Sequence, residues 1–208
     1  DAPPWEPLAR FERPDGFACF EGERNPSVST NVHVLEALNK APPAPEVGRL
    51  REKAIAFLKE TQGDDGCWID KWHISPLYTT GHAVIALLDG APELAARGLR
   101  WLVAAQNRDG SWGSPGTDEE TAYAVQALAH ALLRAPSSGE RAVGADAMRQ
   151  AIRAGAGFLT HRLECSDYPE LWVGKGLYTP IHVVRSAVLS ACRLAAHVLQ
   201  PAAVFSRF

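Results

Sequence analysis

The chain has 208 residues, of which 46% are hydrophobic and 22% charged. These values suit a globular chain of one or two domains and exclude a disordered one. The net charge of -3 offers no basic surface for nucleic acid. No apolar run reaches the roughly 18 residues of a transmembrane helix, and residues 1–5 have no signal-peptide pattern. We therefore expect a cytoplasmic protein with no membrane span and no nucleic-acid partner.

The spacing of apolar residues predicts an all-α fold with no convincing strand. Residues 1–28 are rich in proline and glycine, and we expect an irregular N-terminal segment that packs on the remainder, residues 29–208. Helices are predicted over residues 29–40, 46–62, 77–89, 92–106, 117–134, 141–163 and 181–199. The four cysteines form no Cys-x-x-Cys pair, so we expect them to be reduced and buried: Cys19, Cys67, Cys165 and Cys192.

Two segments repeat each other. Residues 55–68 and 99–112 both read as an aromatic-Leu pair followed by Gln-x-x-Asp-Gly-x-Trp, and the two copies lie 44 residues apart. We expect the glutamine to cap backbone groups, the glycine to supply a positive φ and the tryptophan to stack over the turn. Hairpins whose turns are held together in this way by glutamine and tryptophan, here called stapled hairpins, predict an α/α barrel. The chain would supply four inner and three outer helices, seven in all, whereas a closed six-hairpin barrel has twelve.

The repeated unit resembles the QW motif of the terpene-cyclase superfamily, whose members have α/α-barrel domains. Three further segments look like those of bacterial class II diterpene cyclases of the copalyl diphosphate synthase type: residues 17–38, 70–78 and 171–180. Together the similar stretches extend over most of residues 15–180. The resemblance implies a reaction in which geranylgeranyl diphosphate is protonated and closed to a bicyclic diphosphate, with Mg²⁺ accompanying the diphosphate.

One departure from this family is clear. The Asp-x-Asp-Asp motif that supplies the acid is absent, and the nearest string, Gln62-Gly63-Asp64-Asp65, is explained as the turn of a QW unit. The chain also lacks an initiator methionine. We expect it to be the C-terminal part of a barrel domain, inactive alone, whose partner is the remainder of the same cyclase: the upstream barrel helices and a second helical domain.

Cyclisation through carbocations needs a dry cavity with aromatic faces. The side chains that we expect to line it are aromatic or polar and lie at inner-helix starts or in irregular segments: Asn31, His33, Trp72, His73, Tyr78, Tyr123, Trp172 and Tyr178. Lys175, between two glycines, is a candidate for the diphosphate, and Arg185 is positioned to assist it. For each of these, a purely structural role is the competing interpretation.

Other polar residues have simpler explanations. Glu119 and Glu120 fit a capping box that begins at Thr117, with favourable helix-dipole charges. Asp65-Gly66-Cys67 resembles the zinc-binding string of protein prenyltransferase β-subunits, but the histidine expected later is missing, so we predict no metal ligand in this chain. The alternative functions are a non-catalytic α/α-hairpin scaffold, a lipid-binding fragment and, less favoured, a prenyltransferase β-like subunit.

Overall fold

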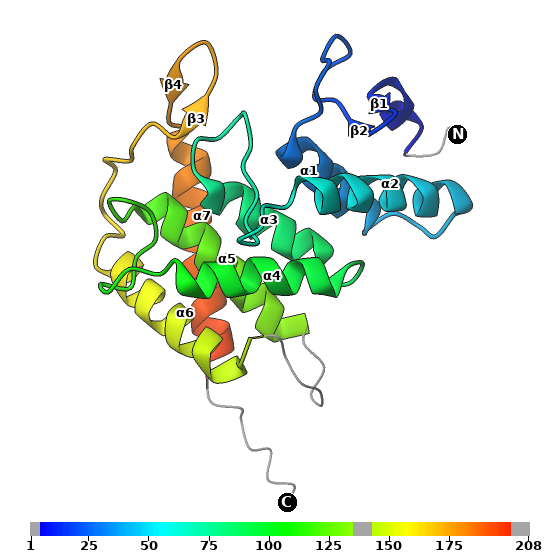
Figure 1. Ribbon diagram of the computed structural model, residues 1–208. Coiled ribbons are helices and arrows are strands. Elements are labelled where there is room, and N and C mark those ends of the chain that lie inside the picture. The colour runs from blue at the N-terminus through cyan, green and yellow to red at the C-terminus, as the bar shows by residue number, and fades with distance from the viewer. Residues whose placement is uncertain (1–4, 135–142, 201–208) are drawn as a thin grey trace, which may run out of the picture.

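The computed structural model describes residues 5–134 and 143–200, which fold into helices joined by turns and loops (Figure 1). The helices are α1 (Val28–Leu38), α2 (Pro45–Thr61), α3 (Pro76–Leu87), α4 (Pro92–Ala104), α5 (Asp118–Arg134), α6 (Ala145–Thr160) and α7 (Ile181–Leu199). All seven predicted helices are confirmed, with ends that differ by a few residues. The predicted start of the sixth helix, Arg141, lies outside the described residues, and α6 ends three residues before Leu163.

Local sequence signals explain where these helices begin. The Ser27 and Ser75 side chains accept hydrogen bonds from the Thr30 and Leu77 amides and so cap α1 and α3. The first turns of α2, α3 and α4 contain a proline, which needs no intrahelical donor at that position.

The prediction that the chain has no strand was wrong in detail. Four two-residue strands form two antiparallel hairpins: β1 (Glu12–Arg13) with β2 (Gly16–Phe17), and β3 (Trp172–Val173) with β4 (Leu177–Tyr178). Residues 6–10 form a short 3₁₀ helix, so the segment before α1 is partly ordered rather than irregular. Strands of two residues carry no alternating pattern, which is why periodicity could not predict them.

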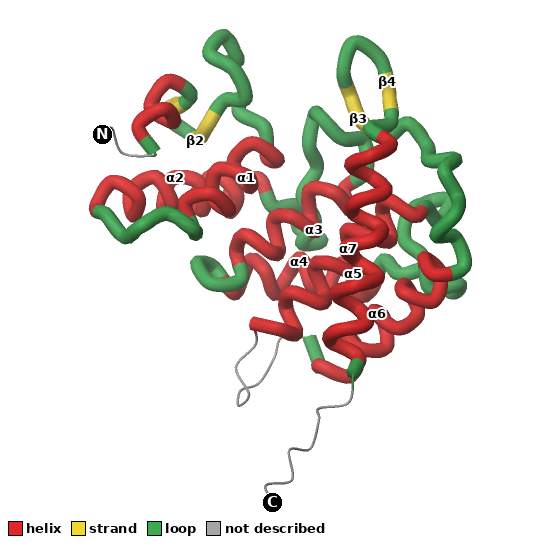
Figure 2. The backbone as a smooth tube through the Cα atoms, turned by 180° about the vertical axis from the view of Figure 1, so that it is seen from behind, coloured by secondary structure: helices red, strands yellow, loops and turns green. Residues whose placement is uncertain are grey.

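The contacts between helices define two layers. Figure 2 shows the same helices from behind. An inner series runs α1, α3, α5, α7, in which each helix packs against the next, and the outer helices α2, α4 and α6 pack on α1, α3 and α5. Helices α1 and α7 lie at opposite ends of this series. The architecture is therefore the predicted all-α, α/α-barrel type, with four inner and three outer helices in the described chain.

Both repeats are stapled by the same hydrogen bonds. The buried indoles of Trp68 and Trp112 donate to the carbonyls of Leu58 and Leu102 at 2.8 and 2.7 Å. One end of each turn is held by a glutamine: Gln62 donates to the carbonyls of Gly66 and Leu94, and Gln106 to those of Gly110 and Ala151. The expected role of glutamine, binding backbone groups, is confirmed, and each glutamine also reaches the next outer helix. Each tryptophan is held by an indole hydrogen bond to the preceding helix, which the sequence did not predict.

The turns require glycine. Gly66 and Gly110 have φ angles of +98° and +89°, a region that other residues rarely adopt. A Cβ added at either one would lie 2.7 Å from a carbonyl oxygen of the following outer helix, that of Arg97 or Ala154. Glycine therefore permits both the tight turn and the close approach of backbone to backbone.

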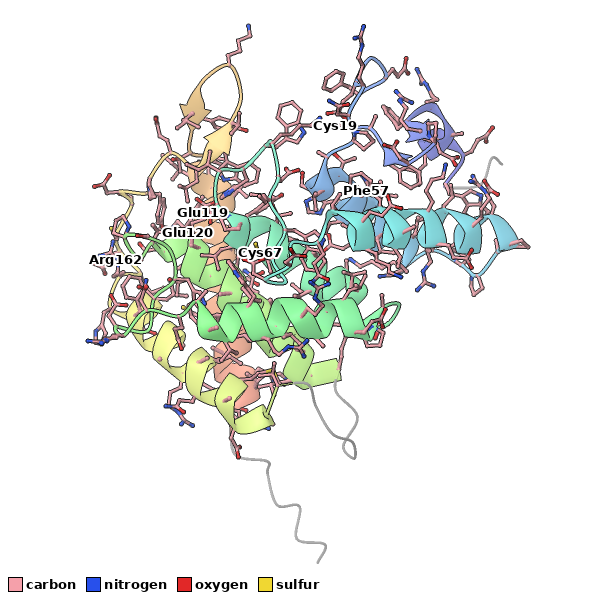
Figure 3. The ribbon with its side chains drawn as sticks, in the orientation of Figure 1. Cys19, Phe57, Cys67, Glu119, Glu120 and Arg162 are labelled. Carbon is pink, nitrogen blue, oxygen red and sulfur yellow. The ribbon has the colours of Figure 1, made fainter. Side chains whose placement is uncertain are left out.

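Two details differ from the sequence expectations. The cysteines are free but not buried, because Cys19 is exposed and Cys67, Cys165 and Cys192 are half-buried (Figure 3 labels Cys19 and Cys67). In the described chain, α7 is the one helix whose length and apolar composition would suffice to cross a membrane. This is weak evidence for a membrane span, because the core helices of soluble proteins pass the same test.

Candidate functional site

An aromatic cluster lies at the start of the inner helices. We define it as His73, Tyr78, His82, Tyr123 and Trp172. The Tyr78 ring is at its centre: its centroid lies 4.7 Å from His73, 4.9 Å from His82 and Trp172, and 5.2 Å from Tyr123. The His73 and Tyr78 rings are stacked at 17°, whereas the other contacts of Tyr78 are edge-to-face. Four of the eight residues predicted to line a cavity thus come together here.

Four separate segments bring these rings to one place. Tyr78 and His82 lie one turn apart on α3, and Tyr123 projects from α5, which packs against α3. Backbone pairing fixes the other two, because His73 forms a bridge with Trp172 and the Leu171 carbonyl accepts from the Ile74 amide. Since β3 and β4 are the strands of one hairpin, this hairpin is what carries Trp172 to the helices.

Glu119 lies behind the cluster and has a different role from the predicted cap. Its side chain, labelled in Figure 3, is completely buried. Its Oε1 accepts hydrogen bonds from Trp172 Nε1 at 2.7 Å and the Tyr123 hydroxyl at 3.0 Å. The His73 ring Nε2 lies 3.3 Å from the same oxygen. The predicted capping box is half formed: the Glu120 amide donates to the Thr117 hydroxyl, but the Glu120 carboxylate accepts from the Thr117 and Ser75 hydroxyls, and the Thr117 amide donates to Trp112. Sequence reasoning missed Glu119 because both residues occupy the first helical turn.

A charged group borders the cluster on the side of α1. Glu36 accepts from His33 Nδ1 at 2.9 Å and lies 3.5 Å from His82 Nδ1, and His33 Nε2 lies 3.0 Å from the Tyr78 hydroxyl. His33 was predicted as a cavity residue, whereas Glu36 and His82 were not. The three-residue spacing of His33 and Glu36 on one helix face was the signal available in the sequence.

Burial raises the pKa of the Glu36 carboxyl, but hydrogen bonds from His33 and His82 outweigh it and lower the pKa to about 2, from an ordinary 4.5. A carboxyl with a depressed folded-state pKa stabilises the fold above its unfolded pKa and loses this contribution as the pH falls through its folded pKa. We predict that Glu36→Gln removes about 1–3 kcal/mol of stability at neutral pH.

The same variant should flatten the fall in stability between pH 4.5 and 2. Thermal unfolding measured over a series of pH values tests this. Glu60→Gln, which alters an exposed carboxyl on α2, should leave the pH dependence unchanged. An unaltered acid limb in Glu36→Gln would contradict the prediction.

Three other predicted residues lie apart from the cluster or at its edge. Asn31 is buried, and its amide bonds both the amide and the carbonyl of Phe17, so it holds β2 on α1. Trp72 is half-buried and packs edge-on against Phe20, with Lys71 over its ring. Tyr178 is 45% exposed, and its ring centroid is 6.5 Å from that of Trp172. Asn31 thus has a structural position, while Trp72 and Tyr178 lie near the surface.

The two residues predicted to contact a diphosphate are both exposed. Lys175 lies in the turn between β3 and β4, and Arg185 lies on the first turns of α7. Neither forms an ion pair or a side-chain hydrogen bond within the described part of the chain, so both guanidinium and ammonium are free to meet an anion there.

An open groove is separate from the aromatic cluster. It has a volume of about 810 Å³ and lies beside the turn between α4 and α5, where Asp118, Arg162 and Trp101 line it. Arg162 Nε and Asp118 Oδ1 form an ion pair of 2.6 Å in this groove. None of the five cluster residues lines it, so the groove and the cluster are distinct features.

The residues that suggested zinc, Asp65 and Cys67, contact each other in the first repeated turn. The Asp65 carboxylate accepts a hydrogen bond from the Cys67 amide. Burial of the Cys67 thiol, and secondly its contact with the Asp65 carboxylate, raise the pKa of this thiol to about 11. Within the described residues, one group of side chains places three possible metal ligands together, and it is His33, Glu36 and His82. Two imidazoles with one carboxylate differ from the all-oxygen set that Mg²⁺ prefers.

Repeated hairpins with glutamine and tryptophan staples, and an aromatic cluster at the start of the inner helices, define an α/α-barrel protein. Residues 21–164 match the squalene-hopene cyclase C-terminal domain family, and the chain belongs to that family.

The chain is similar to several named proteins. It is 42% identical over 181 residues to an ent-copalyl diphosphate synthase of a Streptomyces species, covering 83% of this chain and 34% of that protein. It is 39% identical to the type B diterpene cyclase of Mycobacterium tuberculosis, covering 90% of this chain and 36% of that protein. The solved ent-copalyl diphosphate synthase of Streptomyces platensis superposes with a TM-score of 0.79 at 37% identity, covering 91% of this chain and 37% of that one. The chain thus spans about a third of these relatives' length.

Proposed function

We propose that the whole protein is a class II diterpene cyclase, acting in the cytoplasm, that converts geranylgeranyl diphosphate to a bicyclic copalyl-type diphosphate. The observation that carries the proposal is the aromatic cluster around Tyr78, set in a chain whose named relatives are copalyl diphosphate synthases and diterpene cyclases. Stacked and edge-on rings offer π-faces to a developing positive charge, which is the stabilisation that a cyclisation through carbocations requires.

In this proposal the chain supplies a wall of the cavity and the acid comes from the remainder of the same cyclase. Protonation of the terminal alkene starts the reaction, ring closure passes the positive charge along the hydrocarbon, and loss of a proton ends it with the diphosphate retained. The aromatic cluster would exclude water and bind the charged intermediates. The protonated alkene itself would be formed at an acid outside residues 1–208.

The diphosphate would lie near the β3–β4 hairpin, where Lys175 and Arg185 are exposed and unpaired in the described chain. Mg²⁺, when bound with the diphosphate, would neutralise part of its charge. The cluster of His33, Glu36 and His82 does not fit that ion, and we assign no magnesium ligand to this chain.

The direct test incubates the whole protein with geranylgeranyl diphosphate and Mg²⁺ and identifies the product by mass spectrometry after phosphatase treatment. A bicyclic C20 alcohol is the expected result. Recovery of geranylgeraniol alone would refute the proposed function. Loss of product on mutation of the upstream acid would show that protonation starts the reaction.

We predict that Lys175→Ala raises the KM for geranylgeranyl diphosphate about tenfold, because one charge-assisted hydrogen bond to the diphosphate is lost. The effect on kcat should be smaller, and thermal stability should not change because the side chain is exposed. Steady-state kinetics of the whole protein measure both constants. Lys59→Ala, at an exposed site on α2, is the control. An unchanged KM in Lys175→Ala would remove this residue from the diphosphate site.

A further inference from the structure

The Glu119 carboxylate is the most deeply buried charged group beside the aromatic cluster. Its side chain has no solvent exposure. Oε1 accepts hydrogen bonds from Trp172 Nε1, the Tyr123 hydroxyl and His73 Nε2. The other carboxylate oxygen, Oε2, has no hydrogen-bond partner in the described residues. Three donors converge on Oε1, which matches the acceptor capacity of a carboxylate oxygen. The hydrogen-bond pattern therefore favours the ionised form.

The neighbours of Glu119 are hydrogen-bond donors. His73 Nδ1 lies 3.1 Å from the Ser75 amide nitrogen and 3.2 Å from the Ser75 carbonyl oxygen, and its Nε2 faces Glu119 Oε1 at 3.3 Å. Burial, and next the charge of Glu119, raise the pKa of Tyr123, so that its hydroxyl keeps its proton. In the described chain, no lysine or arginine forms an ion pair with Glu119, and His73 is its one recorded ion-pair contact.

A buried carboxylate with no lysine or arginine partner is costly, and in a low-dielectric site its field extends over several ångströms. All three of its donors are ring side chains of the aromatic cluster, and donation to an anion increases the electron density of these rings. The faces of Trp172 and Tyr123, and the Tyr78 ring that packs on both, therefore lie in a negative field.

We propose that Glu119 is a positioning residue whose fixed negative charge turns the aromatic cluster into a binding surface for an organic cation without hydrogen-bond donors. This inference rests on the proposed function, because the cation that the reaction would present is a hydrocarbon one. Glu119 acts through Trp172 and Tyr123, and it also holds both rings in place by their hydrogen bonds. A purely structural anchor would hold the rings equally well without preferring a charged ligand.

The test compares two probes of the same shape on the whole protein: a prenyl chain that ends in trimethylammonium and the same chain ending in a neutral tert-butyl group. Dissociation constants are measured by calorimetry. We expect wild-type protein to prefer the cationic probe by about tenfold or more, a ratio that reflects desolvated cation–π and charge attraction. Glu119→Gln, which keeps size and hydrogen-bonding capacity, should lose this preference while its affinity for the neutral probe is retained.

The matched control is Glu120→Gln, since Glu120 is the adjacent buried carboxylate, but it bonds Ser75 and Thr117 rather than an aromatic ring. It should keep the wild-type ratio. Trp172→Phe, at a half-buried site, removes the indole donor and should reduce the ratio severalfold even if Glu119→Gln does not fold.

Three results would overturn the inference: no cation preference in wild-type protein, an unchanged ratio in Glu119→Gln or Trp172→Phe, or an equal loss of both probes in Glu119→Gln. The last would assign Glu119 a structural role. The proposed function fails separately, if wild-type protein forms no bicyclic diphosphate from geranylgeranyl diphosphate. Cation preference without that product would leave the inference standing and reject the reaction.

Discussion

Replacing Trp112 with alanine is expected to lower the free energy of unfolding by about 3–5 kcal/mol, the range for deleting a large buried aromatic side chain. The indole is fully buried, and its Nε1 bond to the Leu102 carbonyl would be lost, leaving that carbonyl with one partner fewer at the end of α4. A ring carbon of Trp112 also occupies the space beside Gly155 that a Cβ would fill, at 2.8 Å. Chemical denaturation measures the loss.

Trp101→Ala is the matched control, because Trp101 is half-buried on the outer face of α4. It should cost less than half as much, about 1–2 kcal/mol, in proportion to the smaller apolar area removed from water. Trp112→Phe should fall between the two, since it keeps most of the ring and loses the hydrogen bond. Equal losses in Trp112→Ala and Trp101→Ala would contradict the idea that the repeated tryptophan is a staple.

The second large effect is expected at the centre of the aromatic cluster. Tyr78→Ala should reduce the rate of product formation from geranylgeranyl diphosphate by about 100-fold or more, because it removes the ring that contacts every other member of the cluster. Tyr78→Phe keeps the ring and loses only the contact with His33, so its rate should fall less than tenfold. Initial rates of the whole protein give both values.

Loss of folding must be separated from loss of chemistry in this comparison. Leu87→Ala creates a cavity at a fully buried site on the same helix, outside the cluster, and should destabilise the protein to a similar extent. At a temperature where all variants are folded, it should retain the wild-type rate. If Leu87→Ala and Tyr78→Ala slow the reaction equally, the cluster contributes only to packing.

The stapled turns were predictable because their chemistry is local. Each tryptophan bonds a carbonyl ten residues earlier, and each glutamine bonds a carbonyl four residues later, so one short string contains most of the motif. The repetition of that string then predicted the layering of inner and outer helices. The β1–β2 and β3–β4 hairpins escaped prediction because two residues are too few to show a period.

The candidate site was predicted in part, for a different physical reason. His73, Tyr78, Tyr123 and Trp172 were proposed from their residue types, and the structure brings them together, although their function stays a prediction. Glu119 was assigned to the helix cap because its position in the first turn satisfied a local rule. The contact that gives it another role is with Trp172, 53 residues away, and no local pattern contains that information.

The direction of the staples has a consequence for how such a chain can lengthen. Gln62 and Trp68 close their own hairpin and also touch Leu94 and Gly98 of the following outer helix, and the second copy meets Ala151 and Gly155 in the same way. To pack on the hairpin before it, a new unit needs only two features on its outer helix. These are a carbonyl that accepts from the preceding glutamine and a small residue that leaves room for the preceding tryptophan. Tandem duplication of the gene segment would therefore produce a fitting neighbour at once, before any further substitution.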